Sequence, residues 1–380
     1  MLLEFLDKKP LFYDTIDYTR MPRAYASIKH LLNLPKIIHI IGTNGKGSTG
    51  RFIAQLLHNA NYSVGHYTSP HIINFNERIW IDGANVTDQQ LNDAHTQLLK
   101  YLQPDMAEEL SYFEYTTLLA MVLFQSCDYV VLEAGLGGEH DATAVFHNHL
   151  TVVTPIGFDH QSFLGNTLKE ITTTKLRAIK KEAIIAQQPH KEVMDIVQEY
   201  AQESGYTIRS YTEYIDSDDI AQSALYAQKF HLASYLQENL KVALAVLHHL
   251  SIPVDLEKLQ QPQLFGRCTR YANNIILDVG HNPLAAQALL QALKPKRYIL
   301  VYNTYKDKEY TKILTILAPI ILRVEIITIN DARAVAPQDL YKALQECNLP
   351  YQPFTTINED ENYLVFGSFS VVEAFLRRHS

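Results

Sequence analysis

The residues from Ile37 to Gly50 constrain the fold more than any other part of the chain, because an apolar run there ends in a glycine-rich turn with a single lysine. The run "KIIHIIG" predicts a buried strand over 36–42, and "GSTGRFIAQLLHNA" predicts a helix over 47–60. A strand that turns through glycines into a helix presents backbone N–H groups and a positive helix end to an anion. The segment therefore predicts a phosphate-binding βα unit.

Short β-branched runs and longer helical patterns alternate along the rest of the chain, which is typical of parallel α/β architecture. After the first strand, strands are expected over 62–69, 128–135, 150–157 and 183–187, and helices over 88–101, 112–126, 167–181, 190–205 and 236–250. The polar segment 210–220 is interpreted as an irregular or antiparallel insertion.

Periodicity stops in "QPQLFGRCTRYANN", over 261–274, where Pro, Gly and Asn gather. The alternation then restarts, with strands expected over 274–280, 297–303, 324–330 and 363–368 and a helix after each of them. We therefore expect a P-loop-containing ATPase domain with a mostly parallel sheet over 1–268. A smaller Rossmann-like α/β domain is expected over 269–380.

The composition and charge of the chain indicate which kinds of binding partner to expect. The formal net charge is -8, and no block of lysines or arginines offers a footprint for nucleic acid. The three cysteines are far apart, as in a protein of a reducing compartment. Acidic residues inside "MLLEFLDKKP" argue against a signal peptide, and the apolar stretch 313–329 is interrupted by Pro319, Arg323 and Glu325. We expect a cytoplasmic monomer with small-molecule substrates and no nucleic-acid or membrane partner.

The phosphate loop departs from the strict G-x-x-x-x-G-K-[ST] pattern, because Ile40 replaces the first glycine and Gly47 separates Lys46 from Ser48. The physical parts are nevertheless present: glycines for the turn, a lysine for β- and γ-phosphates, and hydroxyls for Mg²⁺. An ordinary glycine-rich turn would not explain a lysine between two glycines. The residues of the loop expected to bind ATP are Thr43, Asn44, Gly45, Lys46, Gly47, Ser48 and Thr49.

Polar residues downstream stand where strands end, which is where parallel sheets place ligands. Glu133 ends "YVVLE", and His160 follows a strand in "TPIGFDHQSFLG", where Asp159 would orient it. Ser69 ends another strand, with Arg78 nearby. Taken alone, each residue also has a structural explanation. Glu133 could cap the next turn, His160 could have its hydrogen bonds satisfied within a turn, and Ser69 could belong to an ordinary Ser–Pro turn.

Together, "GTNGKGS", "TSPHIINFNERI", "FEYTTLLA", "EAGLGGEHDAT", "IGFDH", "FGR", "DVGHNP" and "GSF" follow the order seen in folylpolyglutamate and dihydrofolate synthases. The chain resembles these ATP-dependent ligases of the Mur ligase superfamily from about Arg23 to its last helix. The resemblance implies that a substrate carboxylate attacks the γ-phosphate of ATP. The amine of L-glutamate then attacks the resulting acyl phosphate.

The resemblance also implies two Mg²⁺ ions and a modified lysine. Ser48 would hold the first ion, and the second would be held by Ser69, Glu133 and His160. Lys175 in "TTTKLRA" aligns with a lysine that the family carbamylates, although Leu-Arg-Ala follows it here instead of Ala-Gly-Ile. From the helical pattern alone, Lys175 would be a solvated helix lysine. With Lys46 and His281, it completes the expected catalytic set.

Further positions are carried over in the same way. Asn239 matches an asparagine near the adenine, and Arg267 matches a hinge arginine that contacts the ATP phosphates. Asp278 and His281 of "DVGHNP" match residues that reach ATP and the incoming glutamate, and Ser368 matches a serine of the amino-acid site. A buried helix amide at Asn239 and a helix-start signal at His281 are the alternatives from local pattern.

The acceptor expected from the resemblance is dihydropteroate, a folate, or both. Arg78 and Asp141 are the residues expected to bind it. The chain departs from the family near this site, with Glu139 in place of Arg and Ala144 in place of Asn, and at the hinge, with Phe265 in place of Pro.

Other classes of protein fit less well. A cell-wall Mur ligase carries an extra N-terminal domain, whereas the first strand here begins at Lys36. A P-loop kinase or GTPase-like switch would have a strict phosphate loop and no second α/β unit. A nucleotide-binding protein without enzymatic activity is the third alternative.

Overall fold

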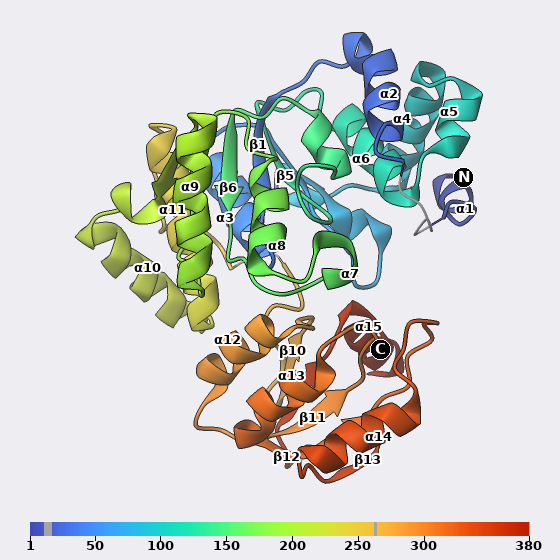
Figure 1. Cartoon of the computed structure of the whole chain (residues 1–380), viewed down its shortest axis with the longest axis vertical. Helices are drawn as coiled ribbons and strands as arrows, with labels where there is room; N and C mark the ends of the chain where they lie inside the picture. Colours follow the sequence, from blue (N-terminus) through green and yellow to red (C-terminus); the bar gives the residue numbers. More distant parts are fainter. Residues whose placement is uncertain (11–16, 262–263, 380) are drawn as a thin grey trace. The chain divides into compact units, whose positions relative to one another are not determined.

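The computed structural model describes residues 1–10, 17–261 and 264–379, and it divides into two compact α/β units (Figure 1). The first unit comprises Met1–Ile156, Leu164–Gln222 and Asn239–Pro262, and the second comprises Gly157–Phe163, Ser223–Glu238 and Gln263–Ser380. Pro262 and Gln263 of the predicted boundary segment lie outside the described residues. The functional division into 1–268 and 269–380 stays a prediction.

The first unit is built on a sheet whose strand order, among the described residues, is β4-β3-β2-β5-β1-β6-β7-β8. The strands are β1 Lys36–Ile41, β2 Val64–Tyr67, β3 Ile79–Ile81, β4 Ala84–Asn85, β5 Tyr129–Glu133, β6 Leu150–Val153, β7 Glu182–Ile185 and β8 Thr207–Ser210. Strands β1 to β8 pair in parallel apart from the antiparallel contacts of β3 with β2 and β4. Because β1 lies between β5 and β6, it ends where the strand order reverses, a usual place for ligands.

Helix α3, Lys46–Asn59, packs on β1, β2 and β5, and α8 and α9 lie side by side (Figure 1). The other helices between the chain start and β9 are α1 Leu2–Leu6, α2 Arg20–Ile28, α4 Asp88–Tyr101, α5 Pro104–Glu109, α6 Tyr112–Leu123, α7 Gln161–Leu164, α8 Leu168–Leu176, α9 Lys191–Ser204, α10 Ser217–Lys229 and α11 Ser234–His249. Short 3₁₀ turns are η1 Lys29–Leu31, η2 Phe75–Arg78, η3 Ala142–Val145 and η4 Tyr211–Glu213. Capping boxes start α4, α6 and α8, and Gly205 ends α9 at φ 70.

The second unit contains a sheet of order β13-β12-β11-β14-β10-β9 within the described residues. Its strands are β9 Thr269–Ala272, β10 Ile275–Asp278, β11 Tyr298–Tyr302, β12 Ile321–Ile326, β13 Tyr351–Pro353 and β14 Tyr363–Phe366. Only β9 pairs antiparallel in this sheet as described. Its helices are α12 Pro283–Leu293, α13 Tyr310–Leu317, α14 Pro337–Glu346 and α15 Phe369–His379, with the 3₁₀ turn η5 Ala318–Ile320.

The predicted fold class is confirmed, and the differences are local. The interpretation of 210–220 as an irregular or antiparallel insertion is wrong, because η4 covers Tyr211–Glu213 and α10 begins at Ser217. The strand that ends at Ser210, β8, pairs in parallel with β7. The hydroxyl of Ser210 caps η4, and Asp216 accepts hydrogen bonds from the N–H groups of the first turn of α10. The helix expected over 167–181 ends earlier, at Leu176.

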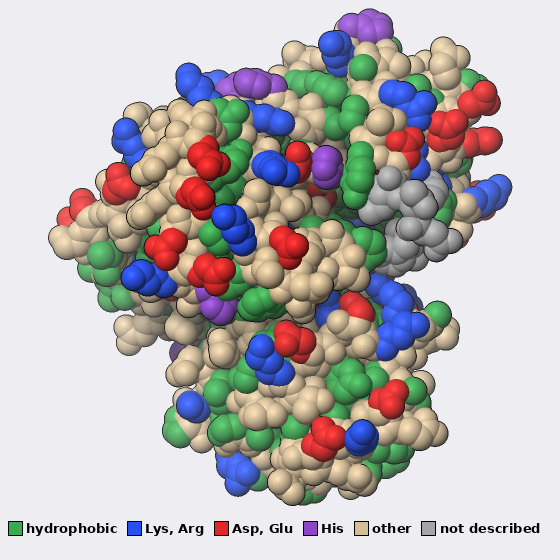
Figure 2. Space-filling view, in the orientation of Figure 1, with side chains coloured by type: hydrophobic (Ala, Val, Ile, Leu, Met, Phe, Trp, Pro, Cys, Tyr) green, Lys and Arg blue, Asp and Glu red, His purple; other side chains and the backbone are tan. Residues whose placement is uncertain are grey.

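The surface carries mixed charge. On the face shown in Figure 2, Lys and Arg side chains are interspersed with Asp and Glu side chains. In the described part of the chain, no helix combines the length and apolar character needed to span a bilayer.

Lys9 follows α1 and is an unusual lysine, because it is only 7% exposed. Its Nζ donates to the carbonyl oxygens of Ala107, Leu110 and Glu108, at 2.5, 2.8 and 3.3 Å, around the end of α5. Burial lowers the pKa of Lys9 from 10.5 to about 8. The ammonium thus supplies partners for carbonyl groups that the end of a helix leaves unpaired.

Replacing Lys9 with Met should lower the free energy of unfolding by about 1–3 kcal/mol, because buried carbonyls lose their donor. Between pH 8 and 10.5 the unfolded chain keeps a proton that folded Lys9 has released, so the stability gap between wild type and variant should widen as pH rises. Urea unfolding at several pH values measures both effects. The exposed neighbour Lys8→Met is the control, and an equal loss in both variants would contradict the assignment.

Candidate active site

The phosphate loop between β1 and α3 is fixed by its contacts with the end of β6. The backbone N–H groups of Thr43 and Asn44 donate to the carbonyl oxygen of Pro155, at 2.9 and 3.1 Å. At Gly42, with φ +142, an added Cβ would lie 2.0 Å from Thr154 Oγ1. Gly45 has φ +84, a conformation that favours glycine. Both turns of the loop therefore need glycine, as the sequence predicts.

These contacts decide which amides of the loop remain for an anion. The N–H groups of Thr43 and Asn44 already have an acceptor. The first residues of α3 are Lys46, Gly47 and Ser48, whose N–H groups have no partner within the helix by geometry. The positive end of α3 and these amides are the part of the loop that could bind an anion.

Two lysines from distant parts of the sequence meet at this loop. Lys46 Nζ donates to the carbonyl oxygens of Gly42 and Thr43, at 3.3 and 3.1 Å. Lys175 is only 4% exposed, and its Nζ donates to the same Gly42 oxygen at 2.9 Å. The interpretation of Lys175 as a solvated helix lysine is therefore wrong. Helix α8 comes this close because Gly138 has no side chain: a Cβ there would lie 2.7 Å from the Lys175 carbonyl oxygen.

Ser48, the expected ligand of the first metal ion, is held from two sides. Its Oγ donates to the carbonyl oxygen of Gly45 at 3.2 Å and accepts from Asn239 Nδ2 at 2.8 Å. Thr49 is buried in the next position of α3. Asn239 was expected near the adenine, and the structure places its amide at the phosphate loop.

Ser69 and Glu133 lie together because β2 and β5 are parallel neighbours with aligned ends. Glu133 Oε2 accepts from the Thr68 hydroxyl and, at 3.3 Å, from the backbone N–H of Ser69. The hydroxyls of Ser48 and Ser69 and this carboxylate are hard oxygen donors, which fit Mg²⁺. His160, the third predicted ligand of the second ion, belongs to the other unit.

Arg78 is buried among aromatic rings, with its guanidinium 5.2 Å from the ring centre of Tyr112 and 5.8 Å from that of Phe75. Its Nε donates to His71 Nδ1 at 2.8 Å. Burial, together with the charge of Arg78, lowers the pKa of His71 to about 4, so this imidazole is neutral and accepts. No local motif marks the rings that hold Arg78.

Asp141 organises the turn between β5 and η3. Its carboxylate accepts from the backbone N–H groups of Leu136 and Thr143, at 2.8 and 2.9 Å, and from the Thr143 hydroxyl at 2.5 Å. Burial raises the pKa of Asp141 despite these bonds. Nearby, Glu139 pairs with Arg177 at 3.0 Å. A role of Asp141 in binding the acceptor stays a prediction.

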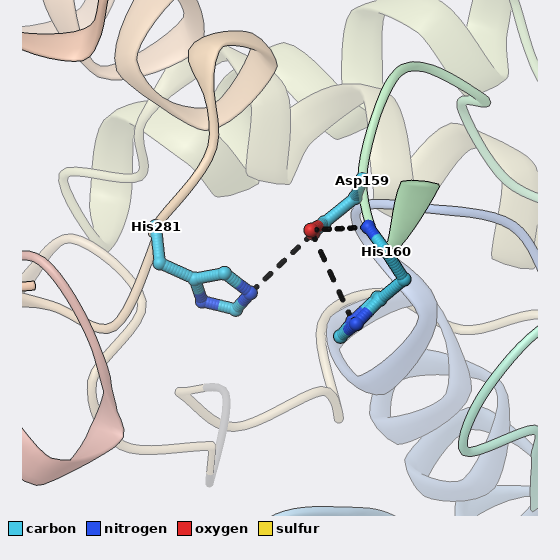
Figure 3. A group of neighbouring side chains, drawn as sticks. All are labelled: Asp159, His160 and His281. Atoms are coloured by element: carbon cyan, nitrogen blue, oxygen red, sulfur yellow. Dashed lines mark hydrogen bonds and ion pairs between the residues drawn. The ribbon is translucent and has the colours of Figure 1, made fainter. Parts of the chain in front are cut away.

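In the second unit, Asp159, His160 and His281 form a cluster (Figure 3). Asp159 Oδ1 accepts from Lys308 Nζ at 2.6 Å, while Oδ2 accepts from Asn282 Nδ2 at 2.9 Å and lies 3.5 Å from His281 Nε2. Burial acts to raise the pKa of Asp159, but the hydrogen bond and charge of His281, with His160 and Lys308, hold it well below its usual range.

The three side chains could offer ligand atoms to a metal ion, since these atoms lie within 4.8 Å of one another. The ammonium of Lys308 already neutralises Asp159 and would repel a second cation. The cluster therefore fits better as an ion pair that fixes His281. Asn282, through its Oδ1, caps α12, so a pure capping role for His281 is excluded.

Asp278 ends β10 and is fully engaged. Its Oδ1 accepts from the N–H of Gly280 at 2.8 Å, and Oδ2 accepts from the N–H of Cys268 at 2.9 Å and from Tyr235 Oη at 2.7 Å. Burial and the carboxylate of Asp278 raise the pKa of Tyr235. Neither Tyr235 nor Lys308 was identified from the sequence, because no local motif surrounds them.

Arg267 and Ser368 lie at the start of α15. The guanidinium of Arg267 stands 5.1 Å from the ring centre of Phe369, and its Nη1 donates to the Gly266 oxygen at 3.2 Å. Ser368 is buried, and its Oγ accepts from the N–H of Val371 at 3.2 Å. The structure thus brings these two predicted residues to one end of the second sheet.

Comparison with known proteins agrees with this geometry. Residues 40–250 match the Mur ligase middle domain, and residues 266–366 match the Mur ligase glutamate ligase domain. The dihydrofolate synthase/folylpolyglutamate synthase of Buchnera aphidicola subsp. Schizaphis graminum is 32% identical over 91% of this chain and 89% of its own. The chain belongs to the Mur ligase family, in its dihydrofolate synthase/folylpolyglutamate synthase branch.

Solved members of the branch share the fold. The crystal structure of Helicobacter pylori folylpolyglutamate synthetase is 39% identical, with a TM-score of 0.81 over 100% of this chain and 97% of that chain. E. coli FolC in complex with DHPP and ADP is 26% identical, with a TM-score of 0.84 over 100% and 98%. The family, the fold class and the ATP-dependent ligase activity expected from the sequence are thereby confirmed.

Because a side chain at Gly42 would clash with Thr154, a substitution there tests the role of this Mur ligase loop in nucleotide binding. Gly42→Ala should weaken ADP binding by about tenfold or more, since about 1.4 kcal/mol of lost interaction is tenfold in affinity. The matched control is Gly205→Ala, because Gly205 also has a positive φ, of 70, but nothing within 4 Å of an added Cβ. The control should cost about 1 kcal/mol of stability and leave ADP binding unchanged. Isothermal titration calorimetry measures the affinities, and equal affinities in the two variants would refute the prediction.

Proposed function

We propose that the chain joins L-glutamate to the carboxylate of a folate-type acceptor, dihydropteroate or a folate or both, with cleavage of ATP to ADP and phosphate. One observation carries the phosphate half of this reaction. Lys46 Nζ donates to the carbonyl oxygens of Gly42 and Thr43, so its positive charge stands beside the first turn of α3, where backbone N–H groups have no partner within the helix. Such a site attracts a polyphosphate.

The relatives support the acceptor and the amino acid. The curated relatives of highest coverage are named dihydrofolate synthase/folylpolyglutamate synthase, and the E. coli relative was solved with DHPP and ADP. The motif set and the glutamate ligase domain distinguish this reaction from that of a P-loop kinase or a nucleotide-binding protein without activity.

The residues of the first unit would act mainly by holding and neutralising charge. Lys46 and the first amides of α3 would bind the terminal phosphates, which lowers the repulsion between the acceptor carboxylate and the γ-phosphate. Mg²⁺ would supply further neutralisation, held by Ser48 in one site and by Ser69 and Glu133, with His160, in the other. Arg78 and Asp141 are proposed for the acceptor.

Residues of the second unit would serve ATP and the amino acid. Asp278 and Arg267 are proposed for the nucleotide, and His281 and Ser368 for L-glutamate. Lys175 is proposed to become carbamylated, which would reverse its charge next to the metal sites. We further propose a monomer in the cytoplasm that has no nucleic-acid or membrane partner.

The direct test is phosphate release by the purified protein with ATP, Mg²⁺, L-glutamate and an acceptor, measured separately with dihydropteroate and tetrahydrofolate. Release above the minus-glutamate control with at least one acceptor is the expected result. The ratio of the two rates assigns the acceptor. No release above that control with either acceptor would refute the proposal.

In the same assay, Lys46→Ala should lower kcat by about 10²–10³-fold, because a charge aimed at the transferred phosphoryl group is lost. Its circular dichroism spectrum should match that of the wild type, since Lys46 is not a core residue. Lys191→Ala, on the exposed side of α9, is the control and should keep full activity. Unaltered turnover in Lys46→Ala would remove the assigned role.

Glu133→Gln should raise the Mg²⁺ concentration for half-maximal rate by about tenfold or more, because a carboxylate ligand becomes a neutral amide. The hydrogen bonds from Thr68 and Ser69 can persist with the amide oxygen, so the fold should be kept. A Mg²⁺ titration of the rate measures the effect, with Glu192→Gln on the surface as control. An unchanged magnesium requirement argues against ligation by Glu133.

A further inference from the structure

A buried amide contacts the expected metal ligand of the phosphate loop. Asn239 Nδ2 donates to Ser48 Oγ at 2.8 Å across 191 residues of sequence, and each of the two residues is 5% exposed. Both belong to the first unit. The contact links α11 to the first turn of α3.

The hydrogen bonds of Ser48 limit how its hydroxyl can be used. A serine hydroxyl has one donor and two acceptor positions. The proton is donated to the Gly45 oxygen at 3.2 Å, and one acceptor position takes the amide of Asn239. A cation at the loop therefore has one lone pair of Ser48 Oγ to use, and its direction is set by the other two bonds.

We propose that Asn239 is a positioning residue that turns the hydroxyl of Ser48 towards the divalent ion of the bound nucleotide, and that it does not read the adenine base. The proposal rests on the proposed function only in that the loop binds a metal–nucleotide complex. It replaces the adenine role that the resemblance implied for this residue.

The packing of Asn239 supports this role. A Cβ at Gly45 would lie 3.0 Å from Asn239 Oδ1 and 3.3 Å from Nδ2, so the whole amide lies against the turn of the loop. Helix α11 cannot rotate easily, because Leu240, Ala243 and Leu244 are fully buried beside it. Asn239 has a short side chain, it stands on a helix that is held in place, and its amide packs on the loop. It is therefore a rigid support for the hydroxyl of Ser48.

Removing a group that orients a metal ligand typically costs about 10–100-fold in metal affinity. Asn239→Ala should therefore weaken Mn²⁺ binding to the protein–ADP complex by about tenfold, the lower end for such positioning groups. Electron paramagnetic resonance of free Mn²⁺ measures this affinity. Without metal, the affinity for ADP and the preference for ADP over GDP should stay within about twofold of the wild type, as expected if no base contact is lost.

A double-mutant cycle separates this role from others. If Asn239 acts through Ser48, Asn239→Ala should have no further effect on Mn²⁺ affinity in the Ser48→Ala background. The matched control is Asn148→Ala, a buried asparagine of the same unit that hydrogen-bonds to the Ala178 oxygen at 3.4 Å. It should leave both Mn²⁺ affinity and base preference unchanged. Asn239→Leu, similar in size and without a donor, gives the same test if the alanine variant is unstable.

The outcomes are distinct. A changed ADP-over-GDP preference in the Asn239 variants that persists with Ser48→Ala would establish the adenine role and overturn the proposal. Unchanged Mn²⁺ affinity, or an effect that simply adds to that of Ser48→Ala, would also overturn it. Because the measurements use only Mn²⁺, ADP and GDP, they stand even if the acceptor is not a folate.

Discussion

One carbonyl oxygen, that of Pro155, accepts hydrogen bonds from the N–H groups of both Thr43 and Asn44, and the phosphate loop depends on it. The strand order makes this contact available, because β6 is the parallel neighbour of β1 and the two strands end at the same edge of the sheet. The loop is thus bent by a partner from the fold and not by its own glycines alone. Its remaining amides, at the start of α3, face the position where an anion is best stabilised.

The fold also brings positive charge to the phosphate loop. Lys46 is adjacent in sequence, whereas Lys175 arrives on α8, and both ammonium groups reach the Gly42 oxygen. As ammonium groups, both would attract a polyphosphate bound at this loop. If Lys175 is carbamylated, the same position would present an anion and would favour a metal ion instead. The buried site therefore makes the chemical state of one lysine decisive for what the loop attracts.

Local pattern predicted most of the fold and the residues that act within their own motif. The strand–loop–helix unit at Gly42 and the helix start at Pro283 depend on glycine turns and a capping asparagine, which are visible in a few neighbouring letters. The pattern failed over 210–220, where side-chain caps at Ser210 and Asp216 start helical turns in a polar segment. The contact of Asn239 with Ser48 was not predicted, because it joins two helices that are far apart in the sequence.

The environment of the buried lysines could not be predicted from local sequence. Lys9, Lys175 and Lys308 look like solvated lysines from their neighbours, yet each is buried against groups that come from far along the chain. Removing an ammonium from water costs several kcal/mol unless strong partners replace the solvent. Lys9 receives carbonyl oxygens at a helix end, whereas Lys308 receives the carboxylate of Asp159, which also binds Asn282 and lies beside His281. The first arrangement completes a helix, and the second fixes the start of α12, where a histidine proposed to contact substrate stands. The partner of a buried lysine, rather than the lysine itself, therefore indicates whether the charge serves the fold or the site.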